Sequence, residues 1–555
     1  MNKKFSQIIS SAAPSQVGWG IFLLSLILFT IGTLNQQFGF GVEESRYILF
    51  AQKMLHTGIT AFPLLRTEFY PDYPATYTIL IYLFSLLGHQ VTPFTAILPS
   101  ALAAAWTLML TYRLAALYSA RWGIYAVLFA LGTYEFLLLA RLPSPDPIVA
   151  AVAISSFFIL YRDHYTGRNN AHWALPLLFL GGFLIRGPLG IIIPAVVSCS
   201  FYLVENEYKR FVITALYSLL LLVICTVFLL LTARHVGGAV FAKQVFFMQA
   251  AGRVVHLGQR PFYYYFVNGL GAFALAFPIA VIVCGAHAKE ILGSGRLLSW
   301  IKPPANAEYR LLRHLVAWVL AVFIVLSLSK EKHFRYVIAV APALALLAGY
   351  GFISLKSSRL LHYTRRCLTI GGMLLPFIGL ALVVTLLIVN RFWLPLTAYY
   401  LWATAILVAL IVAVFSCKQL RQFDEPRRKL AYFAIGIATW LTLFIAIAEP
   451  IAEQQFTSIK PLIDRVETLR TADQQIVLYK MVLDREGLKF MALLDETSPP
   501  PFLMSEEELA QYNPRAIFIS RAADYADLPE ELKKQYKVLW QGKQARRSWV
   551  VFIKS

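Results

Sequence analysis

Charged side chains are scarce in this sequence. Asp, Glu, Lys and Arg together make up 14% of the 555 residues, whereas hydrophobic residues make up 58%. Soluble domains of ordinary composition carry a charged fraction of about 25%. The low charge content therefore excludes a water-soluble globular protein and predicts a helical chain that crosses a membrane many times.

Acidic residues are the scarcer of the two charged classes. The chain has 30 Asp and Glu against 50 Lys and Arg, which gives a net charge of +20. Such an excess also occurs in proteins that bind nucleic acid, but here the basic residues lie between hydrophobic segments. We therefore expect anionic membrane lipids, and no nucleic acid, as the partner of this charge.

Cysteine is rare, and its positions exclude several kinds of site. The five cysteines lie in or at the ends of hydrophobic segments, at no spacing typical of metal ligands or of a disulfide framework. The sequence also has no nucleotide-binding glycine motif, internal repeat or low-complexity tract. We expect buried, apolar cysteine side chains and neither a nucleotide nor a redox cofactor.

Long hydrophobic segments dominate the first 450 residues. A helix needs about 20 apolar residues to cross a membrane. We predict thirteen spans, at 17–35, 93–112, 122–140, 147–161, 173–186, 188–204, 211–232, 263–286, 312–328, 336–354, 367–389, 393–416 and 430–448. No small-residue cleavage site follows the first span, so we expect a retained helix.

The distribution of Lys and Arg predicts the orientation. With the N-terminus in the cytoplasm, every inner loop carries Lys or Arg, as the positive-inside rule requires. These loops are 113–121, 162–168, 205–210, 289–310, 356–366 and 418–429. Thirteen spans then place the C-terminus outside, so we predict a multi-pass protein of the plasma (inner) membrane.

The composition changes after residue 450. We divide the chain into a transmembrane domain, 1–451, and an outer C-terminal α/β domain, 452–555. In the second domain, short apolar runs predict strands at 475–479, 516–520, 537–540 and 549–553, with helices at 458–469 and 505–512. In the first domain we predict two helices lying on the outer membrane surface, at about 43–57 and 74–87.

An acidic pair, Glu43 and Glu44, lies just past the first span. Adjacent carboxylates repel each other, so they need water, a cation or a basic partner. A solvated helix start explains the pair as well as a functional site does. The apolar residues that follow recur at helical spacing, which favours a helix at the membrane surface. They are Tyr47, Ile48, Ala51, Met54 and Leu55.

Charged residues recur in the other predicted outer loops, against the positive-inside trend. Carboxylates with a surplus of cations suit a divalent metal ion and a phosphate-bearing ligand. Each residue taken singly is also explained as ordinary loop charge. Together with the acidic pair, the group comprises Asp146, Arg141, Arg186, Arg253, His256, Lys330, Lys332, His333 and Arg335.

Six short motifs occur in a fixed order between about residues 40 and 345. They are EESRY from Glu43, FYPDYP from Phe69, Ala140-Arg141 with Asp146, IRGPLG from Ile185, PFYYY from Pro261 preceded by Arg253, and the segment 327–336 with Pro342. In this order they resemble the GT-C class of membrane glycosyltransferases. The similar branch contains protein O-mannosyltransferases and the aminoarabinose transferases that modify lipid A.

This resemblance implies roles for individual residues. Glu43 takes the place of a catalytic, metal-associated Asp, with Glu44 beside it, and Asp146 that of a second acidic residue. A divalent metal ion at Glu43 and Asp146 is the candidate cofactor. The candidates for binding the donor phosphate are Arg46, Arg186, Arg253, Lys330, Lys332 and Arg335.

Three positions depart from the family pattern. Glu43 replaces an Asp, Arg186 replaces a Lys, and Tyr73 stands where the lipid A enzymes have a Lys before Pro74. The last departure bears on the identity of the sugar more than on the type of reaction.

The resemblance implies transfer of a hexose or pentose from a polyprenyl-phosphate-linked donor to a lipid A-like lipid or another cell-envelope acceptor, on the outer side of the membrane. Glu43 or Asp146 would accept a proton from a hydroxyl acceptor or hold a metal, and a phosphate acceptor would need no base. The alternative is a transporter or flippase of anionic lipid-linked substrates, for which we would expect a repeat and broken helices. A structural protein would leave the charged clusters unexplained.

The basic inner loops generate a prediction of topology. Reporter tags inserted at 289–310 and at 418–429 should report the cytoplasm, and a tag after Ser555 should report the outer compartment. A cytoplasmic C-terminus would contradict the count of thirteen spans and the one-sided placement of the charged residues.

Overall fold

The computed structural model describes residues 12–33, 41–65, 68–71, 74–167, 170–251, 260–292, 306–329, 332–354, 358–393, 399–422, 424–481, 486–494 and 500–555. The chain forms two compact units. The first, called here the helical unit, comprises Met1–Ile31, Pro71–Pro74 and Pro99–Ala446. The second, called here the mixed unit, comprises Gly32–Tyr70, Ala75–Leu98 and Ile447–Ser555.

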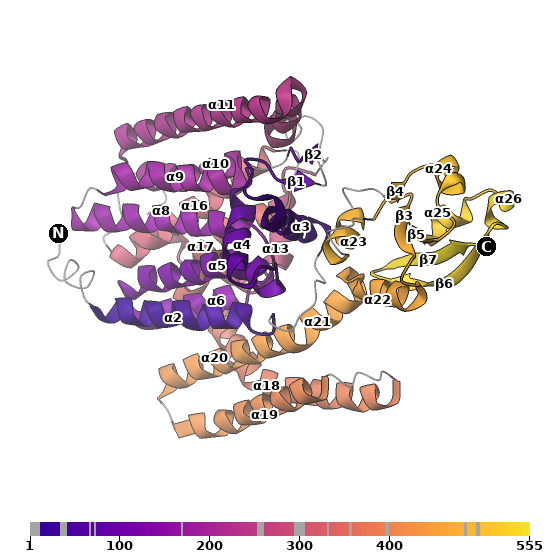
Figure 1. Cartoon of the computed structure of the whole chain (residues 1–555). Helices are drawn as coiled ribbons and strands as arrows, with labels where there is room; N and C mark the ends of the chain where they lie inside the picture. The colour runs from indigo at the N-terminus through magenta and orange to yellow at the C-terminus, as the bar shows by residue number, and fades with distance from the viewer. Residues whose placement is uncertain are drawn as a thin grey trace. The chain divides into compact units, whose positions relative to one another are not determined.

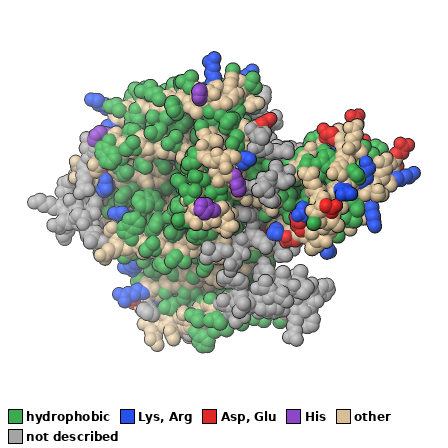
Figure 2. All heavy atoms as spheres, viewed as in Figure 1, with side chains coloured by type: hydrophobic (Ala, Val, Ile, Leu, Met, Phe, Trp, Pro, Cys, Tyr) green, Lys and Arg blue, Asp and Glu red, His purple; other side chains and the backbone are tan. Residues whose placement is uncertain are grey.

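The helical unit is a bundle of apolar helices. Helices α8, α9, α10 and α16 pack beside one another, and α6 packs against α17 (Figure 1). Figure 2 shows hydrophobic side chains over much of the visible face of this unit. The helices are α2 (Ala12–Thr30), α5 (Pro93–Ala116), α6 (Ala120–Leu131), α7 (Tyr134–Ala140), α8 (Asp146–Thr166), α9 (Ala171–Arg186), α10 (Pro188–Val204), α11 (Tyr208–Phe246), α13 (Tyr264–Ala272), α14 (Ala276–Ala286), α15 (Ala288–Leu292), α16 (Ala307–Ser327), η4 (Phe334–Val340), α17 (Ala341–Ile353), α18 (Arg359–Trp393), α19 (Tyr399–Gln419) and α20 (Glu425–Leu443).

Every one of the thirteen predicted spans overlaps a helix of the structure. Among the described residues, six helices are long and apolar enough to cross a membrane, or seven if the bent pair α6 and α7 forms one span. Six shorter apolar helices accompany them. The helical, many-span architecture is therefore confirmed, and the number thirteen stays a prediction.

Two of the predicted spans are broken. The segment 122–140 forms α6 and α7, which bend by 76° at Gly132 and Thr133. The segment 263–286 forms α13 and α14. A Cβ atom added to Gly132 would lie 2.5 Å from Leu275 Cδ2 and 2.8 Å from Ile437 Cδ1, so a larger residue at the bend would require these two side chains to shift. The hydropathy of this segment is continuous across the break, and no proline marks it.

The hairpin between α9 and α10 also depends on glycine. Gly187 connects the two helices with φ +60°, a left-handed conformation that glycine adopts without strain. A Cβ atom on Gly182 would lie 2.1 Å from the Gly190 carbonyl oxygen, and one on Gly190 would lie 1.9 Å from the Gly182 oxygen. The two helices therefore touch through their backbones, and this contact brings the end of α9 close to α8.

The mixed unit contains the predicted C-terminal strands. The sheet order is β4-β3-β5-β7-β6, with β3, β4 and β5 parallel and β7 antiparallel to both β5 and β6. Residues of β3 alternate between two apolar clusters, one on each face of the sheet. The elements are α22 (Lys460–Leu469), β3 (Gln475–Tyr479), α23 (Leu488–Leu493), β4 (Phe502–Leu503), α24 (Glu506–Gln511), β5 (Ala516–Arg521), α25 (Ala522–Ala526), α26 (Glu530–Lys533), β6 (Tyr536–Gln544) and β7 (Arg547–Lys554).

Two helices from the first hundred residues belong to the mixed unit. They are α3 (Val42–Thr57) and α4 (Thr76–Ser85), and they coincide with the two segments predicted to lie on the membrane surface. The short hairpin of β1 (Leu64–Leu65) and β2 (Glu68–Phe69) lies between them in the chain. The placement of α3 and α4 at a membrane surface stays a prediction.

The backbone contact between α9 and α10 generates a test with a matched control. Gly182→Ala should lower the thermal stability of the purified protein, by about 1–3 kcal/mol, because the added Cβ forces the helices apart. Gly181→Ala, one residue away, meets nothing within 4 Å and should leave the melting temperature unchanged or slightly raised. Equal melting temperatures of the two variants would show that the helices do not touch there.

Candidate functional site

A buried ion pair joins two helix ends in the helical unit. Asp146 is the first residue of α8, and Arg186 is the last residue of α9. Arg186 Nε lies 3.0 Å from Asp146 Oδ1, and the two side chains are only 2% and 4% exposed. The structure thus brings two of the predicted site residues into direct contact.

A pair of serines completes the surroundings of Asp146. The Ser144 hydroxyl donates to Asp146 Oδ2 at 3.0 Å. Ser144 is itself fixed by Ser100 of α5, whose hydroxyl donates to the Ser144 carbonyl at 2.8 Å and accepts from the Ser144 amide at 3.0 Å. Both carboxylate oxygens of Asp146 are therefore engaged, and the orientation of the carboxylate is fixed.

Arg335 and Tyr336 of η4 lie near Arg186. The Arg186 guanidinium carbon is 5.5 Å from the centre of the Tyr336 ring, and that of Arg335 is 5.9 Å from the same centre. Two guanidinium groups thus lie near one aromatic ring, and the ring attracts both cations electrostatically without neutralising them. Arg335 is half-buried, whereas Arg186 is fully buried.

Glu135 is a residue that sequence reasoning missed. It lies in the first turn of α7, and its charge interacts with those of Asp146 and Arg335. The sequence contains a signal for it, since an acidic residue within an apolar span marks a functional position. We overlooked this signal because the segment 122–140 was read as one continuous span.

Lys332 has partners of its own. Its ammonium group donates to the carbonyls of Ser329 and, at 3.3 Å, of Arg260, while Arg260 donates to the Lys332 carbonyl at 2.8 Å. Burial lowers the pKa of Lys332. Arg260, which the sequence analysis did not select, also lies over the Tyr264 ring, with its guanidinium carbon 4.6 Å from the ring centre. These contacts fasten the segment before η4, and a phosphate-binding role of Lys332 stays a prediction.

Other charged residues from the predicted group have different positions. Arg141 is fully buried and donates from Nη1 to the carbonyls of Leu28, Phe29 and Ile31 at 2.9–3.1 Å, so it caps the C-terminal end of α2. The ring of His333 packs edge-on against Tyr336 at 5.3 Å. Arg253, His256 and Lys330 lie outside the described residues.

The acidic pair occupies the start of α3 in the mixed unit. Glu43 and Glu44 lie in the first turn, where the helix dipole favours negative charge, and both are half-buried. Arg46 donates to the Tyr70 hydroxyl at 3.0 Å and lies over the rings of Tyr47 and Tyr70. A catalytic role of Glu43 and Glu44, and a phosphate-binding role of Arg46, stay predictions.

The surroundings of Asp146 do not suit a metal ion. One carboxylate oxygen faces a guanidinium and the other accepts from a hydroxyl, so a cation would have to displace Arg186. Within the part of the chain that the structure describes, no three His, Cys, Asp or Glu residues are grouped as metal ligands. A metal ion at Glu43 or Asp146 therefore remains a sequence-based prediction that the Asp146 geometry does not favour.

The comparisons with known proteins identify the family. A model of the Alg9-like mannosyltransferase family matches residues 69–403, which is more than half of the chain. The chain belongs to this family. It is a membrane glycosyltransferase of the GT-C class, as the motifs indicated. Among curated proteins, no sequence matches at a significant level.

Two solved structures share the fold of this glycosyltransferase. The crystal structure of ArnT from Cupriavidus metallidurans bound to undecaprenyl phosphate superposes with a TM-score of 0.64 at 17% identity, over 97% of each chain. The same protein in the apo state gives a TM-score of 0.63 at 16% identity, over 98% of each chain. The GT-C fold, with apolar helices followed by a small sheet-containing segment, is therefore shown for almost the whole length.

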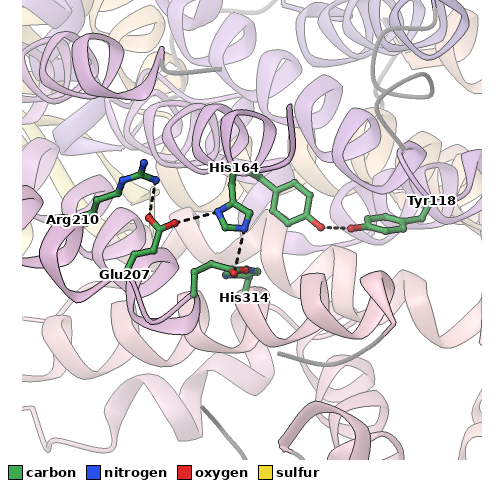
Figure 3. A network of polar contacts seen from close by, with 7 residues as sticks. Tyr118, His164, Glu207, Arg210 and His314 are labelled. Atoms are coloured by element: carbon green, nitrogen blue, oxygen red, sulfur yellow. Dashed lines mark hydrogen bonds and ion pairs between the residues drawn. The ribbon is translucent and has the colours of Figure 1, made fainter. Parts of the chain in front are cut away.

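A second polar centre lies at the opposite end of α8 (Figure 3). His164 lies 3.3 Å from a carboxylate oxygen of Glu205 and 3.5 Å from one of Glu207, and Glu207 also accepts from Arg210 at 2.8 Å. The fully buried His314 of α16 lies 2.7 Å from the other Glu205 oxygen. This network joins α8, α16 and the connection from α10 to α11.

The ion pair of Asp146 and Arg186 generates a prediction on stability and activity. Asp146→Asn keeps the shape of the side chain but leaves the buried Arg186 charge without its counter-charge, which typically costs about 3–5 kcal/mol. We expect a lower melting temperature and loss of sugar transfer. Asp464→Asn, which removes only an exposed ion pair with Lys460, should change neither. Parent-like stability of Asp146→Asn would argue against the buried pair.

Glu205 generates a prediction on pH dependence. Burial by itself would raise the pKa of Glu205, but the hydrogen bond with His314 and the charges of His314, His164 and Arg310 together lower it below its usual value. Because the folded state lowers this pKa, the network stabilises the protein above the unfolded pKa, and the stabilisation is lost as pH falls through the folded value.

We therefore expect Glu205→Gln to melt at a lower temperature than the parent at pH 7, and the difference to shrink between about pH 5 and pH 3. The exposed Glu425→Gln serves as the control and should melt like the parent at pH 7. A difference that stays constant down to pH 3 would mean that the Glu205 charge does not stabilise the fold.

Proposed function

We propose that this protein transfers a sugar from a polyprenyl-phosphate-linked donor to a lipid A-like lipid, or to another cell-envelope acceptor, on the outer side of the membrane. The observation that carries the proposal is the buried pair of Asp146 and Arg186 next to Arg335 and Tyr336. Membership of the Alg9-like mannosyltransferase family supports it. The shared fold with a protein crystallised with undecaprenyl phosphate supports the class of donor.

In this reaction the main task of the protein is to stabilise the charge on the departing phosphate, more than to activate the bond that breaks. In the reaction, the bond between the sugar C1 atom and the phosphate oxygen breaks, and a bond from C1 to the acceptor oxygen forms. Negative charge grows on the departing polyprenyl phosphate, and guanidinium groups stabilise such charge through paired N–H donors. Arg335, half-buried beside the Tyr336 ring, is the cation that we assign to this task.

The acceptor hydroxyl must lose a proton in the same reaction. We assign this proton to Glu43 or Glu44, the carboxylates in the first turn of α3 at the position that the family resemblance gives to the catalytic acidic residue. An acceptor that is itself a phosphate would need no base. Asp146, by contrast, pairs with Arg186 and thereby fixes the guanidinium group that lies beside the Tyr336 ring.

A flippase of anionic lipid-linked substrates is the second candidate. The observation in its favour is the 76° bend between α6 and α7 next to Glu135, because transporters place charge on broken helices. Movement of a polyprenyl phosphate across the membrane without cleavage of its sugar is the behaviour that would separate the two functions.

The test uses the purified full chain in liposomes. Undecaprenyl-phosphate-linked sugars are supplied with lipid A, and mass spectrometry measures release of undecaprenyl phosphate and gain of mass by the acceptor, with and without a chelator. Mass spectrometry of lipid A and surface glycans from cells with and without the gene extends the search for the acceptor. Transport of intact donor between leaflets without release of undecaprenyl phosphate would overturn the proposal in favour of the flippase.

Arg335→Ala tests the role assigned to Arg335. Loss of one charge-assisted contact to phosphate typically costs about 1.5–3 kcal/mol, which is roughly a tenfold to hundredfold loss of transfer. Arg427→Ala removes an exposed arginine that pairs only with Asp424 at the surface, and it should transfer like the parent. Equal rates for the two variants would remove Arg335 from the site.

A further inference from the structure

The short segment that leads from α7 into α8 is rich in proline. Pro143, Pro145 and Pro147 alternate with Ser144 and Asp146. A proline ring fixes φ at about −65° and leaves no backbone N–H group. The segment therefore has little conformational freedom, and Ser144 and Asp146 are the two residues in it that can donate backbone hydrogen bonds.

Both of these backbone donors bind to serine hydroxyl groups. The Ser144 amide donates to the Ser100 hydroxyl at 3.0 Å, and the Asp146 amide donates to the Ser144 hydroxyl at 3.3 Å. The Ser100 hydroxyl also donates to the Ser144 carbonyl at 2.8 Å, so one side chain of α5 binds both polar groups of the Ser144 backbone. Ser100 and Ser144 are only 0% and 5% exposed, so bulk water does not compete for these bonds.

Ser100 differs in this respect from other buried hydroxyl groups of the helical unit. Thr107, Ser156 and Ser198 each donate to the carbonyl four residues earlier in their own helix. Serine and threonine commonly form such local bonds in helices, and these bonds do not connect one element with another. The Ser100 hydroxyl instead donates to a residue 44 positions away in the sequence, and it therefore fastens the start of α8 to α5.

The fastened segment ends at the buried ion pair. The Ser144 hydroxyl donates to Asp146 Oδ2 at 3.0 Å, and Asp146 Oδ1 lies 3.0 Å from Arg186 Nε. The Arg186 guanidinium lies beside the Tyr336 ring, and the Arg335 guanidinium lies near the same ring. A continuous series of contacts thus connects α5 with the guanidinium groups of the candidate site.

We propose that Ser100 is a positioning residue for sugar transfer, which acts through Ser144 on the Asp146 carboxylate. Helix α5 is then part of the active site, although in this role Ser100 touches neither donor nor acceptor. The proposal rests on the proposed function, in which a guanidinium group beside Tyr336 stabilises the departing phosphate.

The expected consequence concerns turnover more than donor binding. The position of the cations matters most when negative charge grows on the departing phosphate, because interactions that strengthen in the transition state determine kcat. A misplacement of about 1 Å can cost roughly a hundredfold in rate. Loss of the Ser100 hydrogen bonds leaves the ion pair and the prolines present, so we expect a smaller loss of kcat, roughly tenfold, with little change in the KM of the donor.

Three substitutions separate the hydrogen bonds of Ser100 from its volume. Ser100→Ala removes the hydroxyl group and leaves a small space. Ser100→Cys fills this space but forms only weak hydrogen bonds, whereas Ser100→Thr keeps the hydroxyl group. Ser156→Ala is the matched control, because Ser156 is also fully buried but donates within its own helix.

The first measurement is hydrogen exchange in the purified full chain, which needs no substrate. The prolines leave two exchangeable amide hydrogens in the segment 143–147, so mass spectrometry of peptides reports on these two directly. Their exchange should be roughly tenfold faster in Ser100→Ala and Ser100→Cys than in the parent, and parent-like in Ser100→Thr and Ser156→Ala. Unchanged exchange in both Ser100→Ala and Ser100→Cys overturns the proposal.

The second measurement is sugar transfer in liposomes, with the donor that the parent uses. We expect kcat to fall roughly tenfold in Ser100→Ala and Ser100→Cys, and to stay close to the parent value in Ser100→Thr and Ser156→Ala. Melting temperatures of all variants report whether the fold is intact. Equal losses of kcat in Ser100→Ala and Ser156→Ala would show a general effect of packing and would overturn the proposal.

A double variant tests whether Ser100 acts through Ser144. Ser144→Ala removes the hydroxyl group that holds Asp146 Oδ2, and it should lower kcat in the same direction. In that background Ser100→Ala should cause little further loss, because the connection to the carboxylate is already broken. Losses that add up fully would contradict action through Ser144.

The positioning role and the proposed function fail in different ways. If exchange becomes faster in Ser100→Ala but kcat and KM stay at the parent values, the positioning role is wrong and the proposed function stands. If the parent itself releases no undecaprenyl phosphate from any donor supplied, the proposed function is wrong and the positioning role falls with it.

Discussion

The ion pair between Asp146 and Arg186 is the interaction on which the helical unit depends. A charge buried away from water is tolerated only with a well-placed counter-charge. The chain meets this requirement with helix ends: Asp146 begins α8 and Arg186 ends α9, so each charge also has the sign that its helix dipole favours. The pair can form because α9 turns sharply at Gly187 and packs backbone to backbone on α10.

Apolar packing explains how distant sequences keep one fold. ArnT from Cupriavidus metallidurans shares only 17% of its residues with this chain, yet 97% of each chain superposes. Apolar helices accept many substitutions if volume and pattern are kept. In the site, the Arg186 guanidinium reaches Asp146 through Nε while its planar group remains beside the Tyr336 ring. A lysine in this position would provide charge without the planar group.

Much of the fold was predictable from local patterns. Hydropathy located a helix in each of the thirteen predicted spans, and short apolar runs located β3, β5, β6 and β7, because both patterns depend on neighbours within one element. The two-residue strand β4 and the short helix α23 were missed, since their apolar residues are too few to form a pattern. The bend at Gly132 was missed because the hydrophobic segment 122–140 continues across it.

The same holds for the candidate site: the sequence predicts which residues belong to it, but not which residues contact one another. Sequence spacing and family resemblance selected Asp146, Arg186 and Arg335, and the structure groups them around Tyr336. Nothing in the sequence reveals that Arg141 caps α2 or that Lys332 is bound to backbone carbonyls. Partner choice depends on which elements meet in space, so it requires the folded chain. Asp146 was read as a residue of an outer loop, whereas burial makes it structural as well as chemical.

Helix α8 carries charged groups at both ends and almost none between. Asp146 is its first residue and His164 lies in its last turn, 18 positions further along the helix, which corresponds to a rise of about 27 Å. This length is close to the roughly 30 Å thickness of a bilayer's hydrocarbon core. Because both ends are fastened, by Arg186 and by Glu205, α8 can shorten neither by fraying nor by sliding. The length of α8 therefore sets the distance between the two polar centres, at Asp146 and at His164, within the helical unit.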